Sequence, residues 1–187
     1  MRKSMIMFAV AMCLSAPMVN LHAASLAGVT LPDTEQAAGA NLVLNGLGLR
    51  TKFFVKVYVA GLYIERKSSD PQAIIATESP KRIVMQFLHG ASTNQMADAF
   101  TDSFNDNSPD AAKTMKAETD RLLGALEPVK VGDKMVFTYV PGKGTTFALN
   151  GKDKLTIADP AFSSLLFSVW LGPNPPNADL KKGLLGQ

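Results

Sequence analysis

The sequence predicts an α+β fold in which an antiparallel β-sheet is covered on one face by helices. The order of its segments is the first observation, because strand-like stretches come first, helical stripes follow, and further strands and helices close the chain. Short turn-forming segments between successive strands are the second. The third is composition, since 187 residues with 47% hydrophobic and 19% charged residues suit one globular domain.

The N-terminus has the features of a secretory signal peptide. Arg2 and Lys3 give a basic start, an apolar run of ten covers residues 5–14, and the small residue Ala23 stands at the cleavage position. A bilayer-spanning helix needs about 20 apolar residues, and no later stretch supplies them, so we expect no transmembrane segment. The alternative interpretation is a first core helix of the domain.

Export changes the charge of the chain. The full sequence has a net charge of +3, but Arg2 and Lys3 supply two of its 19 basic residues and none of the 16 acidic ones, so the mature charge is +1. No basic stripe is visible, which argues against nucleic acid as a partner. Cys13, the one cysteine, also lies in the signal. The mature domain would therefore contain no cysteine, which suits an oxidising compartment. We predict a signal peptide over residues 1–23, one domain over residues 24–187, and a periplasmic location.

The first half of this domain predicts two strands. Residues 25–40 form a small, polar lead-in, and strand-like alternation begins at Asn41 and returns over residues 51–65. One side of the second strand carries Phe53, Val55, Val57 and Val59, and the other carries Phe54, Lys56 and Tyr58. This second side is mixed, so it lines a cleft or meets solvent. Gly46 and Gly48 indicate a bend or a close approach in the first strand.

The middle of the chain predicts a short helix, a strand and two helices. Asp70 followed by Pro71 is typical of a helix start, and that helix reaches about residue 76. Residues 81–89 alternate as a strand. A capping box at Ser92 then begins a helix whose apolar stripe contains Met96, Ala99, Phe100, Ser103 and Phe104. The next helix covers residues 108–127.

The last third predicts a β-meander followed by two helices. Its short strands cover residues 134–140, 145–149 and 154–158, and Asn150-Gly151 is a strong tight-turn signal. Asp159-Pro160 begins a strongly apolar helix that runs through Trp170. Proline-rich residues 172–176 force a turn before a final short helix at residues 178–185.

Two segments resemble cofactor-binding motifs, but neither has the residues and flanking elements that such a site requires. Residues 46–51 begin like a dinucleotide-binding fingerprint, yet they lack the third glycine and enter a strand. Residues 142–145 lack the upstream glycine and the helix of a phosphate loop. His89 is the one histidine of the mature chain, so neither a histidine-rich zinc site nor a Cys-His nucleophile can be assembled. A Ser-His-Asp triad stays open, although no Gly-x-Ser-x-Gly elbow is present. We predict no cofactor and no metal.

Two sequence blocks carry a family resemblance. The stretch Asn45-Gly46-Leu47-Gly48-Leu49-Arg50, with the β-rich run over residues 52–65, resembles the chalcone isomerase-like family. Residues 167–172 and 180–186 look like its exported bacterial branch. The resemblance covers roughly residues 42–186. It implies an open-faced β-sandwich, in which a large antiparallel sheet is covered by helices with a ligand cleft between them.

The resemblance also implies candidate site residues. In plant enzymes of this family, which close a chalcone to a flavanone without a cofactor, an arginine follows Gly-x-Gly-x, a threonine lies in the next strand, and a tyrosine and an asparagine lie on a following helix. Arg50 fits the arginine if the adjoining bend carries a short deletion, whereas an ungapped register places Gly46 there. The threonine position falls on Tyr58, and the helix positions fall on Met96 and Ser103.

These departures favour a binding function over the plant activity. Met96 and Ser103 supply neither phenol nor amide, while Arg50 and Tyr58 share strand parity and together suit a carboxylate or carbonyl. We therefore expect a non-catalytic periplasmic binder of a small apolar ligand such as a fatty or aromatic acid, held by Arg50, Tyr58, Met96 and Ser103. The alternatives are a cofactor-independent isomerase or intramolecular lyase that uses Arg50 and Tyr58, and an assembly partner with a closed cleft. The sequence leaves the oligomeric state open.

Overall fold

The structure is a computed structural model that describes residues 23–187. Its strands are β1 (Ala23–Leu26), β2 (Val29–Pro32), β3 (Thr34–Ala37), β4 (Ala40–Lys52), β5 (Val55–Ile64), β6 (Lys81–Phe87), β7 (Lys134–Val140), β8 (Gly144–Leu149) and β9 (Lys152–Ile157). Its helices are α1 (Pro71–Ala76), α2 (Thr93–Asn107), α3 (Pro109–Thr114), α4 (Lys116–Gly124), α5 (Pro160–Leu171) and α6 (Ala178–Leu184). The predicted signal peptide lies outside the described residues, except for Ala23, with which β1 begins.

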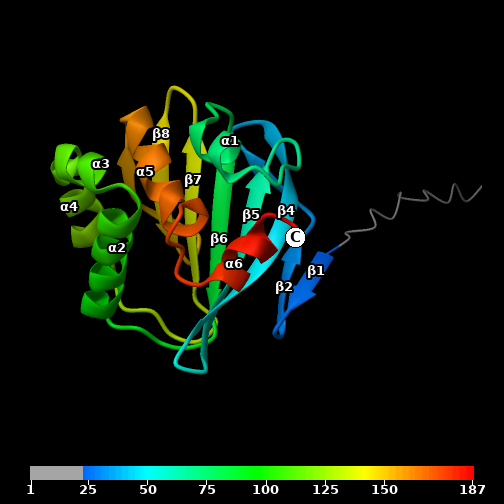
Figure 1. Ribbon diagram of the computed structural model, residues 1–187. Helices are drawn as coiled ribbons and strands as arrows, with labels where there is room; N and C mark the ends of the chain where they lie inside the picture. Colours follow the sequence, from blue (N-terminus) through cyan, green and yellow to red (C-terminus); the bar gives the residue numbers. More distant parts are fainter. Residues whose placement is uncertain (1–22) are drawn as a thin grey trace, which may run out of the picture.

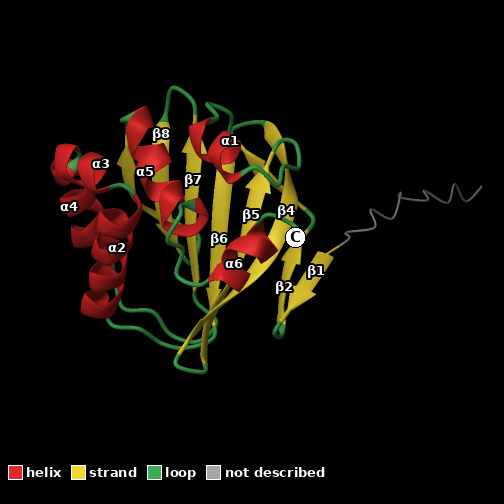
Figure 2. Ribbon diagram, viewed as in Figure 1, coloured by secondary structure: helices red, strands yellow, loops and turns green. Residues whose placement is uncertain are grey.

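Seven strands form one antiparallel sheet in the order β3-β4-β5-β6-β7-β8-β9. Strands that are adjacent in the sequence are therefore neighbours in the sheet, and the helices α2, α3 and α4 are inserted between β6 and β7. The helices lie on one face of the sheet, with α5 and α6 directly over it (Figures 1 and 2). The predicted α+β class, an antiparallel sheet covered by helices, is confirmed.

The main core lies between the sheet and these helices. Its centre is a group of aromatic rings from α2, α5, β7 and β8 that meet edge to face, stacked or tilted: Phe100, Phe104, Phe137, Phe147 and Trp170. Helix α5 is buried along almost its whole length, which explains why its sequence is apolar on every side rather than striped.

A second core covers the opposite face of the sheet. The β1–β2 hairpin places Val29 and Leu31 against Leu42, Val59 and Tyr63 of the sheet. The phenol of Tyr63 donates a hydrogen bond to the carbonyl of Pro32 at 2.8 Å. The predicted lead-in over residues 25–40 is thus wrong, because it forms three strands of four residues each. Strands that short show too little alternation to be recognised from sequence.

Side-chain caps fix the helix starts at the predicted positions. Asp70 accepts hydrogen bonds from two backbone N–H groups at the start of α1, and Asp159 accepts one at the start of α5. Ser92 and Gln95 form the predicted capping box of α2. The helix expected over residues 108–127 is instead two helices, because the backbone leaves helical geometry at Met115, where φ is −100° and ψ is 31°.

Strand β4 and helix α6 touch backbone to backbone through glycines. A Cβ atom at Gly48 would lie 2.3 Å from the carbonyl oxygen of Leu180, and one at Gly183 would lie 2.2 Å from that of Leu47. The buried Asn45 secures this contact, since its Nδ2 donates to the carbonyl of Leu184 at 2.8 Å. The close approach predicted in this strand is therefore made by the C-terminal helix.

Four two-residue turns with positive φ connect neighbouring strands. Three of them place glycine second: Ala27-Gly28, Ala38-Gly39 and the predicted turn Asn150-Gly151. The fourth, between β4 and β5, consists of Phe53 (φ 48°) and Phe54 (φ 67°). Left-handed backbone costs an L-residue other than glycine roughly 1–2 kcal/mol, so this turn is strained. It projects beyond the rest of the sheet at the bottom of Figure 1.

Candidate functional site

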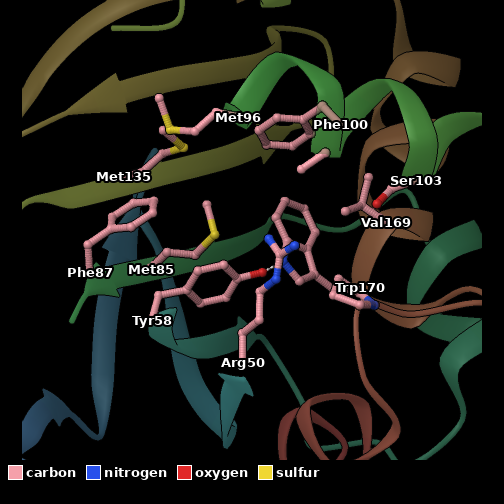
Figure 3. A pocket seen from close by; sticks show the side chains of 12 residues that line it. Arg50, Tyr58, Met85, Phe87, Met96, Phe100, Ser103, Met135, Val169 and Trp170 are labelled. Atoms are coloured by element: carbon pink, nitrogen blue, oxygen red, sulfur yellow. Dashed lines mark hydrogen bonds between the residues drawn. The ribbon is translucent and has the colours of Figure 1, made fainter. Parts of the chain in front are cut away.

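A cleft lies between the helix-facing side of the sheet and the helices α2 and α5. Its sheet wall comes from β4, β5, β6 and β7, and its opposite wall comes from the two helices and from Pro176 in the segment before α6. Figure 3 shows the side chains that line it. Three elements far apart in the sequence, β4–β5, α2 and α5, therefore have to be in place for the cleft to exist.

Arg50 and Tyr58 are placed in the cleft by direct cross-strand pairing. The two residues are opposite each other in the antiparallel β4–β5 ladder. The ladder then shifts, because the next pair is Thr51 with Lys56, which leaves Val57 as the extra residue of a β-bulge. The bulge turns Val57 to the helix side as well, so the alternation predicted for residues 53–59 breaks at this point.

Three polar groups meet on one side of the cleft. The guanidinium carbon of Arg50 lies 5.6 Å from the centre of the Tyr58 ring, a cation–π arrangement. The indole Nε1–H of Trp170 donates a hydrogen bond to the Tyr58 hydroxyl at 3.0 Å. In Figure 3 the guanidinium group lies beside this hydroxyl and the indole ring. Arg50, Tyr58 and Trp170 thus form a connected polar group, which we call the polar triad.

The Tyr58 hydroxyl is held in its neutral form. Burial raises the pKa of the phenol above its usual value of 10.0, and this outweighs the positive charge of Arg50 and the hydrogen bond from Trp170, which lower it. A neutral phenol keeps its proton as a donor. Since its oxygen already accepts from Trp170, the group is set to donate to a ligand in the cleft.

Arg50 is free to bind an anion. Within residues 23–187, no acidic side chain lies within 4.0 Å of its guanidinium group. A guanidinium that is half-buried and lacks a carboxylate partner favours an anionic ligand, because charge-assisted hydrogen bonds are about twice as strong as neutral ones. Arg50 and Tyr58 together therefore offer a cation and a neutral donor to the same group.

Apart from Ser103, the remaining walls of the cleft are apolar and deformable. Methionines from β6, α2 and β7 line it (Met85, Met96 and Met135), together with Phe87 and Phe100. Methionine side chains are flexible and adapt to the shape of a ligand. The cavity volume is about 40 Å³. Since a water molecule needs roughly 10–15 Å³ on this measure, the cleft has room for a group of a few atoms.

A larger groove continues from this cleft toward the β4–β5 turn. It has a volume of about 440 Å³ and shares Arg50, Phe87, Met96 and Ser103 with the cleft. Its far end is lined by Phe53, Val55 and Val57, and its helix side carries the exposed Asp98 and Asp102. Together the inner cleft and the outer groove form one continuous depression, whose outer part also carries polar side chains: Lys52, His89, Gln95, Asp98 and Asp102.

The four site residues predicted from sequence all line this cleft. Arg50 and Tyr58 come from the sheet, and Met96 and Ser103 come from α2. That they bind a ligand stays a prediction. Trp170 was not among the predicted site residues, yet it completes the polar triad. The one signal that pointed to it was its place in the block 167–172 of the family resemblance.

Two further findings concern residues 23–187 as a whole. They contain no group of three or more His, Cys, Asp or Glu side chains placed to hold a metal ion. None of their helices is both long and apolar enough to cross a membrane.

Comparison with known proteins identifies a family and a solved structure of similar fold. A family model described as chalcone isomerase-like matches residues 23–186. Among solved structures, a fatty-acid binding protein of Arabidopsis thaliana is similar, with a TM-score of 0.68 and 13% sequence identity, over 88% of this chain and 96% of that one. No curated protein matches the chain.

Proposed function

Because the chain belongs to the chalcone isomerase-like family, we propose that it is a non-catalytic binder of a fatty or aromatic acid. The observation that carries the proposal is the polar triad, in which Arg50 and the neutral Tyr58 present a cation and a hydrogen-bond donor to an otherwise apolar cleft. A carboxylate with an apolar tail matches both features. The structural neighbour is called a fatty-acid binding protein, so fatty acids are the first ligands to test.

The sizes of the two spaces suggest how the ligand lies. The inner cleft of about 40 Å³ accepts a group as small as a carboxylate beside the triad. The outer groove of about 440 Å³ is within the range of small-molecule sites and would take the apolar tail. The tail would then run past Phe87 and Val57 toward the β4–β5 turn.

The composition of the inner cleft supports binding without catalysis at the polar triad, because the residues of the depression that can act as bases, His89, Asp98 and Asp102, line the outer groove instead. Within the described residues the lining of the inner cleft includes no Asp, Glu, His or Lys side chain. Abstraction of a proton needs a general base within hydrogen-bond reach of the substrate. Arg50 and the neutral Tyr58 are donors, so they stabilise a bound anion but accept no proton from it.

Calorimetric titration with a matched acid and alcohol tests this function. We expect decanoate to bind the wild type, and Arg50→Ala to weaken that binding by about 10- to 150-fold, because a charge-assisted hydrogen bond contributes about 1.5–3 kcal/mol. The same substitution should weaken the binding of decanol much less. Tyr58→Phe removes the second donor and should also weaken decanoate more than decanol. Arg66→Ala is the matched control, because Arg66 is exposed at the opposite end of the sheet.

Two results would contradict the proposal. If Arg50→Ala weakens the binding of acid and alcohol equally, the guanidinium group does not bind the carboxylate. Absence of binding of either compound to the wild type would remove the cleft as a fatty-acid site.

We also propose that the protein is exported to the periplasm. The basic start, the apolar run over residues 5–14 and Ala23 at the cleavage position support this. Cleavage after Ala23 would make Ala24, which pairs with Leu31 in the β1–β2 hairpin, the first residue of the mature protein. N-terminal sequencing of the protein from a periplasmic extract should find a start near Ala24. An intact Met1 in the membrane fraction would refute it.

A further inference from the structure

The tip of the β4–β5 hairpin exposes large apolar side chains to solvent. Phe53 is 85% exposed, Phe54 is fully exposed and Val55 is 42% exposed. The ladder ends with the pair Lys52 and Val55, so the two phenylalanines form the turn itself. An exposed aromatic pair at a projecting tip gains nothing from the protein core, and such patches are typical of interaction sites.

The backbone of this turn argues that the phenylalanines are not there for folding. Both have positive φ, a conformation that bulky residues adopt rarely. The turn Asn150-Gly151 has nearly the same φ values, 52° and 76°, and uses the residues that this geometry prefers. The same chain thus uses a favourable pair at one hairpin and a strained aromatic pair at another. A strained outlier of this kind is a reason to look for function.

Two lysines flank the aromatic tip within its own hairpin, whereas the exposed acidic residues of the outer groove, Asp98 and Asp102, lie on α2. Lys52 and Lys56 are exposed on either side of the tip, and the sequence contains no acidic residue between Glu35 and Glu65. The loop before β7 lies at the same end of the sheet, because Gly132 donates a backbone hydrogen bond to Phe87 at the end of β6. This loop adds the exposed Lys130 and Val131, the latter 69% exposed, together with Asp133, whose carboxylate accepts a hydrogen bond from the backbone N–H of Lys130.

We propose that the hairpin tip docks on the surface of an anionic phospholipid bilayer. Phe53 and Phe54 would enter the boundary between headgroups and acyl chains, where aromatic rings are favoured, and Lys52 and Lys56 would contact lipid phosphates. The combination of apolar residues that enter the boundary with flanking lysines fits this partner better than an apolar protein surface, which would leave the lysines unpaired.

Docking would bring the mouth of the outer groove to the membrane. Phe53 and Val55 line that groove, so a ligand could pass between bilayer and groove without crossing water. This consequence rests on the proposed binding of fatty acids. The docking itself does not, because it needs only the tip and its lysines.

Co-sedimentation with vesicles free of fatty acid tests the docking alone. We expect the chain to bind phosphatidylglycerol vesicles and to bind phosphatidylcholine vesicles much more weakly. Phe54→Gly removes a ring that does not line the groove and relieves the strained φ, so it should weaken binding roughly tenfold without lowering Tm. Lys52→Gln with Lys56→Gln should weaken it by about 25-fold, since each lysine near an anionic surface contributes about fivefold.

A matched charge control uses the other end of the sheet. Lys67→Gln with Lys143→Gln removes the same charge from exposed positions in the loop after β5 and the β7–β8 turn, and it should change binding less than twofold. All variants share one N-terminus, so any effect of residues 1–22 is common to all. Phe54→Trp should be quenched by bromine-labelled acyl chains, whereas the buried Trp170 of the wild type should not.

Three outcomes would overturn the proposal. The first is absence of wild-type binding to phosphatidylglycerol vesicles. The second is binding that Phe54→Gly leaves unchanged. The third is self-association in sedimentation velocity, without lipid, that Phe54→Gly abolishes, because the tip would then dock on a second copy of the chain.

Discussion

At the scale of single residues, Lys81 is buried in an otherwise apolar environment. Its side chain is 1% exposed, and its Nζ donates to the carbonyls of Ile74, Ile75 and Thr77 at 2.7–3.0 Å. These carbonyls lie at the C-terminal end of α1, where a positive charge is favoured. Two aromatic rings lie within 5.3 Å of the same atom. Lys81 thus completes the hydrogen bonds of a helix end that the sheet covers.

Replacing Lys81 by methionine should destabilise the protein by about 2–4 kcal/mol, because three buried carbonyls lose their donor. The loss should also depend on pH. Burial lowers the pKa of Lys81 from 10.5 to about 8 in the folded chain. Between these values the unfolded chain keeps a proton that the folded chain has released, so the wild type gains stability as pH rises from about 8 toward 10.5. Below pH 8 this gain is absent.

Urea unfolding at pH 7 and pH 9.5 measures both effects. The difference in unfolding free energy between wild type and Lys81→Met should be larger at pH 9.5. Lys113→Met, at an exposed position of α3, should change stability little at either pH. If the difference in unfolding free energy between wild type and Lys81→Met is the same at both pH values, burial does not lower the pKa of the Lys81 amine.

At the scale of elements, the contact between β4 and α6 depends on glycine. Gly48→Ala would place a methyl group 2.3 Å from the backbone oxygen of Leu180, and backbone cannot rotate away as a side chain can. We expect a loss of roughly 1–3 kcal/mol or more in thermal or urea unfolding. Gly124→Ala in α4 is the control, because no atom lies within 4 Å of the added Cβ, and alanine favours a helix by up to about 1 kcal/mol. Equal stability of the two variants would contradict the close contact.

Elements with a local signal could be predicted from sequence. The caps at Asp70, Ser92 and Asp159 and the turn at Asn150 each act within a few residues, so their sequence patterns were sufficient. The β1–β2 hairpin was missed, because each strand is only four residues long. Its apolar residues pack against strands that are distant in the sequence, so no local pattern accounts for them. The turn at Phe53 was missed because its residues are typical of strands, not of turns.

The candidate site was predictable as far as strand pairing allowed. The sequence analysis placed Arg50 and Tyr58 on one face by strand parity, whereas in the structure they meet by pairing across the β4–β5 turn, and family resemblance pointed to Met96 and Ser103. Trp170 could not be singled out, because α5 is apolar on all sides and no periodicity separates a residue that faces the cleft from its neighbours. The bulge at Val57 depends on the register with β4, which no single strand encodes.

At the scale of the whole molecule, one sheet supports two cores of different kinds. The face under the helices holds the aromatic core and the cleft, and the opposite face is sealed over β3–β6 by the small β1–β2 hairpin. The cleft therefore has a rigid floor, since the strands that carry Arg50 and Tyr58 are packed from both sides. The parts of the cleft that can adapt to a ligand are therefore the methionine side chains and the helices above them.

The hydrogen bond between Asn45 and Leu184 joins positions 139 apart in the chain. Strand β4 is synthesised before every helix of the described residues, and the helix α6 that covers its glycines follows all of the others. Contacts between such distant segments form late and slow the search for the native state. The strands that carry Arg50 and Tyr58 are therefore made before the helices α2 and α5 that form the opposite wall of the cleft, so the nascent protein has no complete binding site until α5 has been synthesised.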